Sequence, residues 1–148
     1  MEKKGKFKAF YKDNEITKKE MKKNTFMVTQ DVNHQLFTES VLDEVLISQK
    51  CENENIAHNI LKELDLDEFN SRHPLSLSDG QKQRVAVASA IASEKELLLF
   101  DEPSSGLDYE HMIVFGKLLQ SLKEKGKTLI IVTHDEEFIS YCDYTLKL

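Results

Sequence analysis

The sequence predicts an α/β fold built on a parallel sheet. Two runs of consecutive apolar residues, 97–100 and 128–132, show no polar alternation, which is typical of strands buried on both faces of a parallel sheet. The segment between these runs carries apolar residues at helical spacing, so strand, helix and strand together predict a right-handed βαβ unit. The helical stripe consists of Ile113, Val114, Leu118, Leu119 and Leu122.

Length and charge limit the possible functions. The 148 residues, 40% hydrophobic and 31% charged, suffice for one globular domain with a sizeable core. The net charge is −6, but residues 1–23 carry nine Lys against four acids, or +5, which leaves −11 for the remainder. No Arg or aromatic recognition motif accompanies these lysines, so we expect a solvated surface or a loose terminus. The acidic remainder argues against a nucleic-acid partner.

Cysteine usage and hydropathy indicate a compartment. Cys51 and Cys142 are isolated and lack metal-ligand spacing, so reduced thiols in a cytosolic protein are expected. No apolar run approaches the roughly 18 residues of a membrane span, and no signal peptide is visible. The chain is therefore expected neither to cross a membrane nor to be exported.

The remaining elements follow from periodicity and from turn residues. Gly126 is expected to end the helix before the last apolar run as a C-cap. In chain order we expect a strand at 25–29, two helices within 39–62 separated at 53–55, a helix at 82–92, a short helix at 136–141 and a last strand near 145–148.

Polar residues follow the predicted strands. Asp101 and Glu102 come directly after the strand that begins at Leu97, and the carboxyl ends of parallel strands are where open α/β sheets place their chemistry. Gln30 and His134 follow two other strands. Each alone has an ordinary explanation, as a surface glutamine or a solvated histidine, and Ser78 before a helix is an ordinary cap. Their joint order favours a functional site.

In order and spacing, the chain resembles the nucleotide-binding domain of ATP-binding cassette (ABC) transporters from about Phe26 to its end. The resemblance implies a partial P-loop NTPase (ABC ATPase) fold with a helical subdomain. It divides the chain into a core up to the Q-loop (1–38), a helical subdomain (39–76) and a motif-bearing part (77–148). By resemblance, Gln30 is the Q-loop glutamine, Leu77–Gln81 the signature, Leu97–Glu102 the Walker B strand, Ser105–Asp108 the D-loop and His134 the switch histidine.

The resemblance also implies ATP and Mg²⁺ and a role for each residue. Asp101, with Gln30, would hold the metal, and Glu102 would polarise the attacking water. His134 and Gln30 would hydrogen-bond the γ-phosphate, the water or the metal. A second ABC ATPase subunit, packed head to tail, would present its nucleotide to Ser78, Gly80, Gln81 and Asp108.

Two departures from the family pattern stand out. Asp79 replaces the usual signature glycine and places a carboxylate where a phosphate is expected, which is repulsive if both are ionised and close. No G-x-x-x-x-G-K-[ST] loop occurs in the sequence. Gly126-Lys127-Thr128 resembles the end of that loop, but Ser121 stands at the first glycine position. We expect the P-loop upstream of Met1, so that the chain corresponds to the last two-thirds of a cassette.

The stretch 30–41, with Gln35-Leu36-Phe37, is similar to energy-coupling-factor and cobalt-type importers. That likeness implies an ATPase subunit that couples ATP hydrolysis to solute uptake at the cytoplasmic face of the membrane. Because the chain has no P-loop, we expect it to be inactive alone. Its helical subdomain would dock onto a transmembrane coupling protein. A non-catalytic truncated remnant and a soluble ABC-type ATPase remain as alternatives. The resemblance places a P-loop strand beside 128–132, so we expect that edge to promote self-association.

Overall fold

The computed structural model describes residues 9–11, 13–104 and 108–147. Its sheet elements are β1 (Ala9–Tyr11), β2 (Asn14–Ile16), β3 (Thr25–Val28), β4 (Leu97–Asp101) and β5 (Thr128–Val132). Its α-helices are α1 (Lys18–Asn24), α2 (Val41–Ser48), α3 (Glu54–Glu63), α4 (Asp79–Ala92), α5 (Tyr109–Glu124) and α6 (Glu136–Ile139). Short 3-10 turns are η1 (Val32–His34), η2 (Asp67–Phe69) and η3 (Pro74–Ser76).

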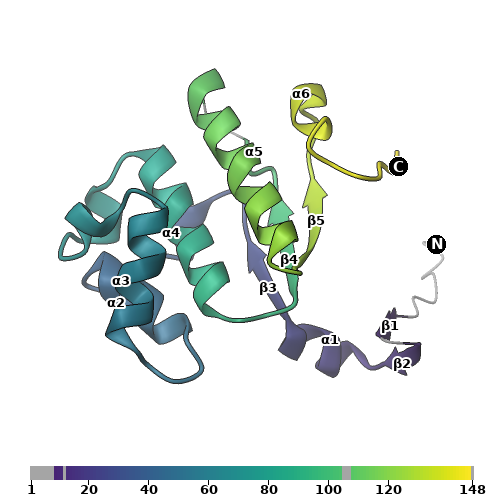
Figure 1. The fold of residues 1–148 in the computed structure, drawn as a ribbon, viewed down its shortest axis with the longest axis horizontal. Coiled ribbons are helices and arrows are strands. Elements are labelled where there is room, and N and C mark those ends of the chain that lie inside the picture. Colours follow the sequence, from purple (N-terminus) through teal and green to yellow (C-terminus); the bar gives the residue numbers. More distant parts are fainter. Residues whose placement is uncertain (1–8, 12, 105–107, 148) are drawn as a thin grey trace, which may run out of the picture.

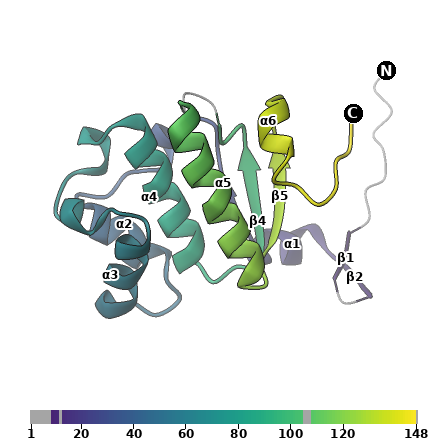
Figure 2. The same ribbon diagram turned by 45° about the horizontal axis from the view of Figure 1, so that its top comes forward.

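The central sheet is parallel in the order β3-β4-β5, which confirms the predicted α/β class. Leu97 pairs with Thr25 on one side and with Thr128 on the other, so all three strands begin at the same level. The helices α4 and α5 lie along one face of this sheet (Figures 1 and 2). Leu98 and Phe100 of β4 point into the core beneath them.

A series of four aromatic rings packs the segment that follows β5 against α5. The rings of Phe100, Phe115, Phe138 and Tyr141 follow one another at centroid distances of 6.0, 5.9 and 5.8 Å. Gly116 makes room for the last ring, because a Cβ at this position would lie 2.6 Å from the Tyr141 ring. The glycine thus permits the close approach of the segment after β5.

A second core lies among α2, α3 and α4, away from the sheet. Its fully buried side chains include Val41, Val45, Leu61 and Val85. Ser40 and Asn53 cap the first two of these helices by accepting hydrogen bonds from Asp43 N and Ile56 N. The predicted pair of helices within 39–62 is therefore present, at 41–48 and 54–63.

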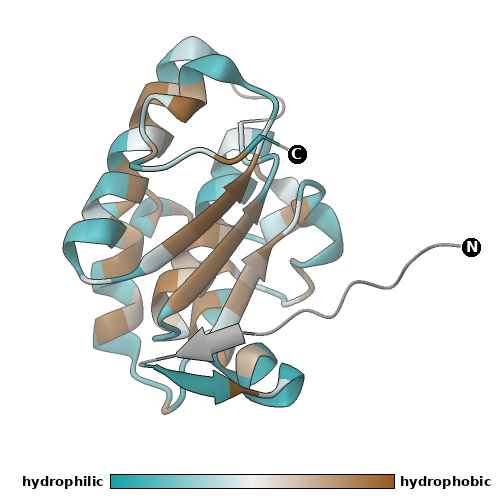
Figure 3. Cartoon of the chain, turned by 90° about the vertical axis from the view of Figure 1, so that its right-hand side faces the viewer, coloured by the Kyte–Doolittle hydropathy of each residue, from teal (hydrophilic) through white to brown (hydrophobic). Residues whose placement is uncertain are grey.

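The other face of the sheet lacks such cover among the described residues. Figure 3 shows this face toward the viewer, with largely hydrophobic strands. Ile130 and Val132 of β5 are 49% and 58% exposed, and Met27 of β3 is also exposed. The prediction of burial on both faces is therefore wrong for β5, whereas Leu97 and Leu99 of β4 are partly buried. In addition, β5 pairs only with β4 and forms an edge of the described sheet.

The lysine-rich start is more ordered than expected. Residues 9–11 and 14–16 form an antiparallel hairpin, with Asp13 at φ 63° in the tight turn. Thr17 then starts α1 through a capping box, in which its side chain accepts from Glu20 N and Glu20 accepts from Thr17 N at 2.8 Å. Residues 13–24 are mostly exposed, as the solvated-surface alternative expected, but local caps order them, so the loose-terminus alternative is wrong for these residues.

Other boundaries differ in detail. The helix expected at 82 begins at Asp79, since Ser78 caps it, and the helix expected at 136–141 ends at Ile139. The predicted last strand is absent at 145–147, and Leu148 lies outside the described residues. The Gly126 C-cap is confirmed: its φ is 80°, its N–H donates to Lys123 O, and Lys127 N donates to Leu122 O.

Candidate functional site

The parallel register brings four predicted site residues to one edge of the sheet. Asp101 ends β4 opposite Val132 of β5, so Glu102 and His134 lie just beyond the ends of adjacent strands. On the other side of β4, Val28 pairs with Phe100, and Gln30 follows two residues later. Side chains separated by 104 positions in the sequence are thus collected at the carboxyl ends of β3, β4 and β5.

Glu102 occupies a strained backbone conformation. Its φ is 47°, in the left-handed region that residues other than glycine rarely adopt. The surrounding hydrogen bonds hold it there, because Glu102 N donates to Val132 O at 2.8 Å and extends the β4–β5 ladder by one step. Such strain, maintained by the surrounding structure, is concentrated at functional sites.

The carboxylate of Glu102 is bound by His134. Glu102 Oε1 lies 2.9 Å from His134 Nδ1, and His134 N donates to Glu102 Oε2 at 3.4 Å. The Glu102 side chain is 19% exposed, whereas that of His134 is 85% exposed. The hydrogen bond from His134 lowers the pKa of Glu102, and the same bond raises the pKa of His134. Each side chain therefore favours the charged form of the other.

Asp101 can be a ligand of a magnesium ion even though the protein does not supply all the ligands. No group of three or more His, Cys, Asp or Glu in the described residues could hold a metal by itself. Mg²⁺, however, usually takes only one or two protein carboxylates beside substrate phosphates and water. Asp101 on β4 and the nearby Gln30 supply one carboxylate and one amide oxygen at neighbouring strand ends, which fits that need.

A neighbouring glutamine, missed as a site residue, shapes the loop that carries Gln30. Gln35 Oε1 accepts from Thr29 N at 2.8 Å, and Gln35 Nε2 donates to Met27 O at 2.7 Å. These bonds continue the end of β3 and close the loop 29–35 around Gln30. The sequence shows Gln35 only as part of the Gln-Leu-Phe element, and nothing in the spacing reveals this contact.

Gln83 was missed for a similar reason. It is buried on α4 and donates from Nε2 to Pro103 O at 3.3 Å, one residue after Glu102. The signal that could have revealed it is a polar residue at a core position of a helix. Its bond ties the first turns of α4 to the segment that follows the candidate catalytic carboxylate.

The predicted signature forms the N-terminus of α4. Ser78 Oγ accepts from Gln81 N at 3.4 Å, and Gln81 Oε1 accepts from Ser78 N at 2.9 Å, so their side chains cap the helix. Asp79 is exposed and pairs with Lys82 at 3.3 Å, which offsets the negative charge expected to oppose a phosphate. Gly80 follows in the first turn.

The predicted D-loop is described only in part. Residues 105–107 lie outside the described residues, and Asp108 is exposed immediately before α5, where its carbonyl accepts from Met112 N at 2.9 Å. The signature residues and Asp108 therefore lie on separate helix starts rather than on the strand ends that carry Glu102 and His134.

A groove of about 440 Å³ lies between α2 and residues 34–37, at the end of η1 and just after it. Its lining includes Phe37, 72% exposed, and the exposed Ile47. Beneath them Glu44 is 4% exposed, and its Oε2 accepts from Phe37 N and Thr38 N at 3.1 Å and from Thr38 Oγ1 at 2.8 Å. This buried carboxylate fixes the backbone that presents Phe37 to solvent.

Comparison with known proteins identifies relatives of this arrangement. Residues 2–105 match the family model described as "ABC transporter". A putative ABC transporter ATP-binding protein of Treponema denticola is 45% identical over 85% of this chain, and the putative HMP/thiamine import ATP-binding protein YkoD of Bacillus subtilis is 35% identical over 88%. The chain covers 26% and 24% of these relatives, about a quarter of their length.

A solved structure shares the fold as well. The cbiO1 protein from Clostridium perfringens, described as part of the ABC transporter complex cbiONQ, superposes with a TM-score of 0.79 at 32% identity. The superposition covers 90% of this chain and 59% of that one. Within the described part of the present chain, no helix is long and apolar enough to cross a bilayer.

Proposed function

Because the chain belongs to the ABC transporter family of ATP-binding proteins, we propose that it supplies the hydrolytic half of an ATPase site that energises solute uptake. The observation that carries this proposal is the Glu102–His134 pair, which lies at 2.9 Å beside Asp101. A carboxylate kept ionised next to a metal-binding aspartate is the arrangement needed to orient a water for attack on a phosphate.

The roles divide among the strand ends. Asp101 and Gln30 would hold Mg²⁺, which neutralises phosphate charge when bound. Glu102 accepts a hydrogen bond from the attacking water. His134, whose side chain is 85% exposed, turns from Glu102 to donate toward the γ-phosphate. In phosphoryl transfer such positioning accounts for most of the rate enhancement.

The same proposal makes the 148-residue chain inactive alone. No G-x-x-x-x-G-K-[ST] loop occurs in it, and such a loop supplies the backbone amides and the lysine that hold the β- and γ-phosphates. The described strand ends provide carboxylates, an amide and an imidazole but no comparable cradle. A P-loop from residues outside these 148 is required for turnover.

The partners follow from two surfaces. The exposed Phe37 and Ile47 would receive an apolar segment of a transmembrane coupling protein of the energy-coupling-factor type, which places the chain at the cytoplasmic face of the membrane. The start of α4, with the exposed Ser78 and the half-buried Gly80 and Gln81, and the exposed Asp108 would meet the nucleotide of a second ATPase subunit packed head to tail.

The test joins this chain to the P-loop-bearing half of a close relative and measures Mg²⁺-dependent ATP hydrolysis. Glu102→Gln and His134→Ala should each reduce turnover by roughly 10²-fold or more, the scale of removing a positioned catalytic group. Glu137→Gln, an exposed carboxylate on α6, is the matched control and should leave turnover unchanged. Full activity in either site variant would remove that residue from the mechanism, and inactivity of the parent chimaera under all conditions would favour a non-catalytic remnant.

A further inference from the structure

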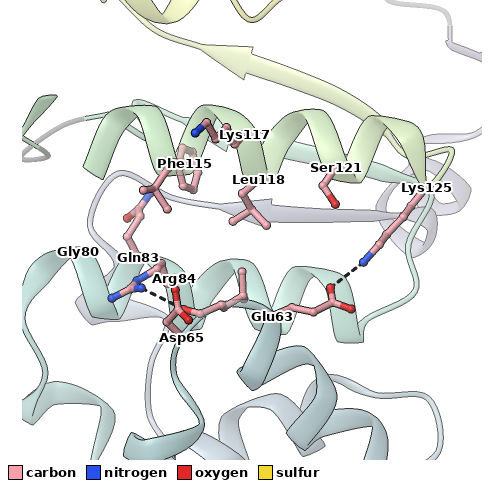
Figure 4. Close-up of a pocket in the computed structure, with 12 residues that line it drawn as sticks. Glu63, Asp65, Gly80, Gln83, Arg84, Phe115, Lys117, Leu118, Ser121 and Lys125 are labelled. Carbon is pink, nitrogen blue, oxygen red and sulfur yellow. Dashed lines mark hydrogen bonds and ion pairs between the residues drawn. The ribbon is translucent and has the colours of Figure 1, made fainter. Parts of the chain in front are cut away.

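A cleft between α5, the C-terminal end of α3 and the first turns of α4 lies apart from the strand-end site, although Gly80 of the predicted signature also lines it. Its volume is about 540 Å³, within the range of small-molecule sites (Figure 4). Leu118 and Phe115 of α5 and Leu64 after α3 line it with apolar surface. At one end Lys125 Nζ bridges to Glu63 Oε2 at 2.8 Å and ties α5 to α3.

Arg84, on the wall of this cleft, is incompletely satisfied. Its Nη1 donates to Leu64 O at 3.0 Å and so caps the end of α3. Its Nε is buried and has no acceptor, and it is the one such side-chain nitrogen or oxygen among the described residues. A buried cationic donor without an acceptor is costly, so Arg84 gains if its side chain turns to meet an acceptor.

We propose that the cleft binds a small amphipathic monocarboxylic acid, with its carboxylate on Arg84 and its apolar body against Leu64, Phe115 and Leu118. Arginine can only donate, and a carboxylate gives it a charge-assisted bond. Nε is covered in the present conformation, so the Arg84 side chain turns toward the cleft as the acid enters.

The charges of the lining select a single negative charge. The carboxylates of Glu63 and Asp65 also line the cleft. Its three cations are Arg84, Lys117 and Lys125, of which Lys125 is already paired with Glu63. A doubly charged phosphate would face both carboxylates, whereas a monocarboxylate meets less repulsion. Ser121 points into the cleft from α5 in Figure 4 and offers a further hydroxyl. An occupant would touch both α5 and the end of α3, and so reinforce the Lys125–Glu63 tie.

Octanoate is the probe, titrated into the isotope-labelled 148-residue chain and followed by amide chemical shifts. We expect saturable changes at Asp65, Ser121 and Lys125, and at least tenfold weaker binding in Arg84→Gln. Arg72→Gln is the matched control, because Arg72 stacks on Phe69 at 5.1 Å and does not line the cleft. Ile130→Lys, on the uncovered sheet face, should also leave octanoate binding unchanged.

Several results would overturn the inference. These are no saturable shifts with millimolar octanoate, equal binding of octanol, or equal binding by Arg84→Gln. Leu118→Trp, which fills the cleft, gives a second test: retained binding in this folded variant would also reject the cleft as the site. The inference does not depend on the proposed ATPase role, because no step of this titration requires nucleotide.

Discussion

The helical region and the sheet region of this molecule differ in how completely they are closed. In the helical region, α2, α3 and α4 surround a core whose central residues, such as Val45 and Leu61, have no exposed surface. In the sheet region, α4 and α5 cover one face, while Ile130 and Val132 remain about half exposed on the other. The helical region closes its core and leaves apolar side chains such as Ile47 exposed only at its surface. The sheet instead presents an apolar face and an edge, and it also carries the candidate catalytic residues.

The largest expected effect comes from a matched pair of truncations. Leu61→Ala removes a fully buried side chain from the helical core and should reduce the free energy of unfolding by about 2–5 kcal/mol. Ile130→Ala removes the same number of carbons from the half-exposed face of β5 and should cost about 1 kcal/mol or less. Urea unfolding of both variants measures the difference. Equal costs would show that the sheet face is covered in solution.

A charge on the exposed edge should change association rather than stability. β5 pairs with β4 alone in the described sheet, and the strand 128–132 carries no charged side chain, so its free edge can pair with another copy. Ile130→Lys should therefore shift the light-scattering mass of the purified chain toward the monomer. Ile47→Lys, in the groove beside α2, is the control; if it alone disperses the protein, the groove is the associating surface.

Different sequence signals predicted the elements of these two regions. Helical spacing and caps such as Ser40 and Asn53 are local signals, and they predicted the helices to within a few residues. The parallel strands were also predictable from their consecutive apolar residues. Asp101, Glu102 and His134 come at the carboxyl ends of these strands, and the carboxyl ends of parallel strands lie at one edge of the sheet. The resemblance supplied the roles of these residues.

Contacts that depend on three dimensions were not predictable. Gln35 bonds to Met27 and Thr29, and Gln83 bonds to Pro103 across 20 residues, without any spacing rule. Exposure of β5 was missed because an apolar run reports the preference of its residues for burial and not whether a neighbouring segment covers them. The terminal strand expected near 145–148 failed for a related reason: three or four residues without a pairing partner do not form a strand.

The smallest expected effect is a titration that isolates the Glu102–His134 contact. The raised pKa of His134 means that its stabilising contribution is present at low pH and is lost as the pH rises through that pKa; the lowered pKa of Glu102 means that its contribution is lost as the pH falls through its own. The contact between Glu102 and His134 is therefore strongest at pH values between the pKa of Glu102 and the pKa of His134.

Glu102→Gln should move the His134 pKa down toward the ordinary value of about 6.5, as followed by imidazole chemical shifts. Asp31→Asn, which removes the exposed partner of His34 at 3.0 Å, should leave His134 unchanged. An unaltered His134 titration in the Glu102 variant would mean that the two side chains do not interact in solution.

The central claim is that these 148 residues hold the hydrolytic groups of an ABC ATPase site but not the phosphate-binding loop, and one assay addresses it directly. Purified chain is incubated with ATP and Mg²⁺, and phosphate release is compared between the parent and Glu102→Gln. We expect both to equal the protein-free background, because no G-x-x-x-x-G-K-[ST] sequence is present to hold the β- and γ-phosphates. Phosphate release by the parent that requires Mg²⁺ and disappears in Glu102→Gln would contradict the account.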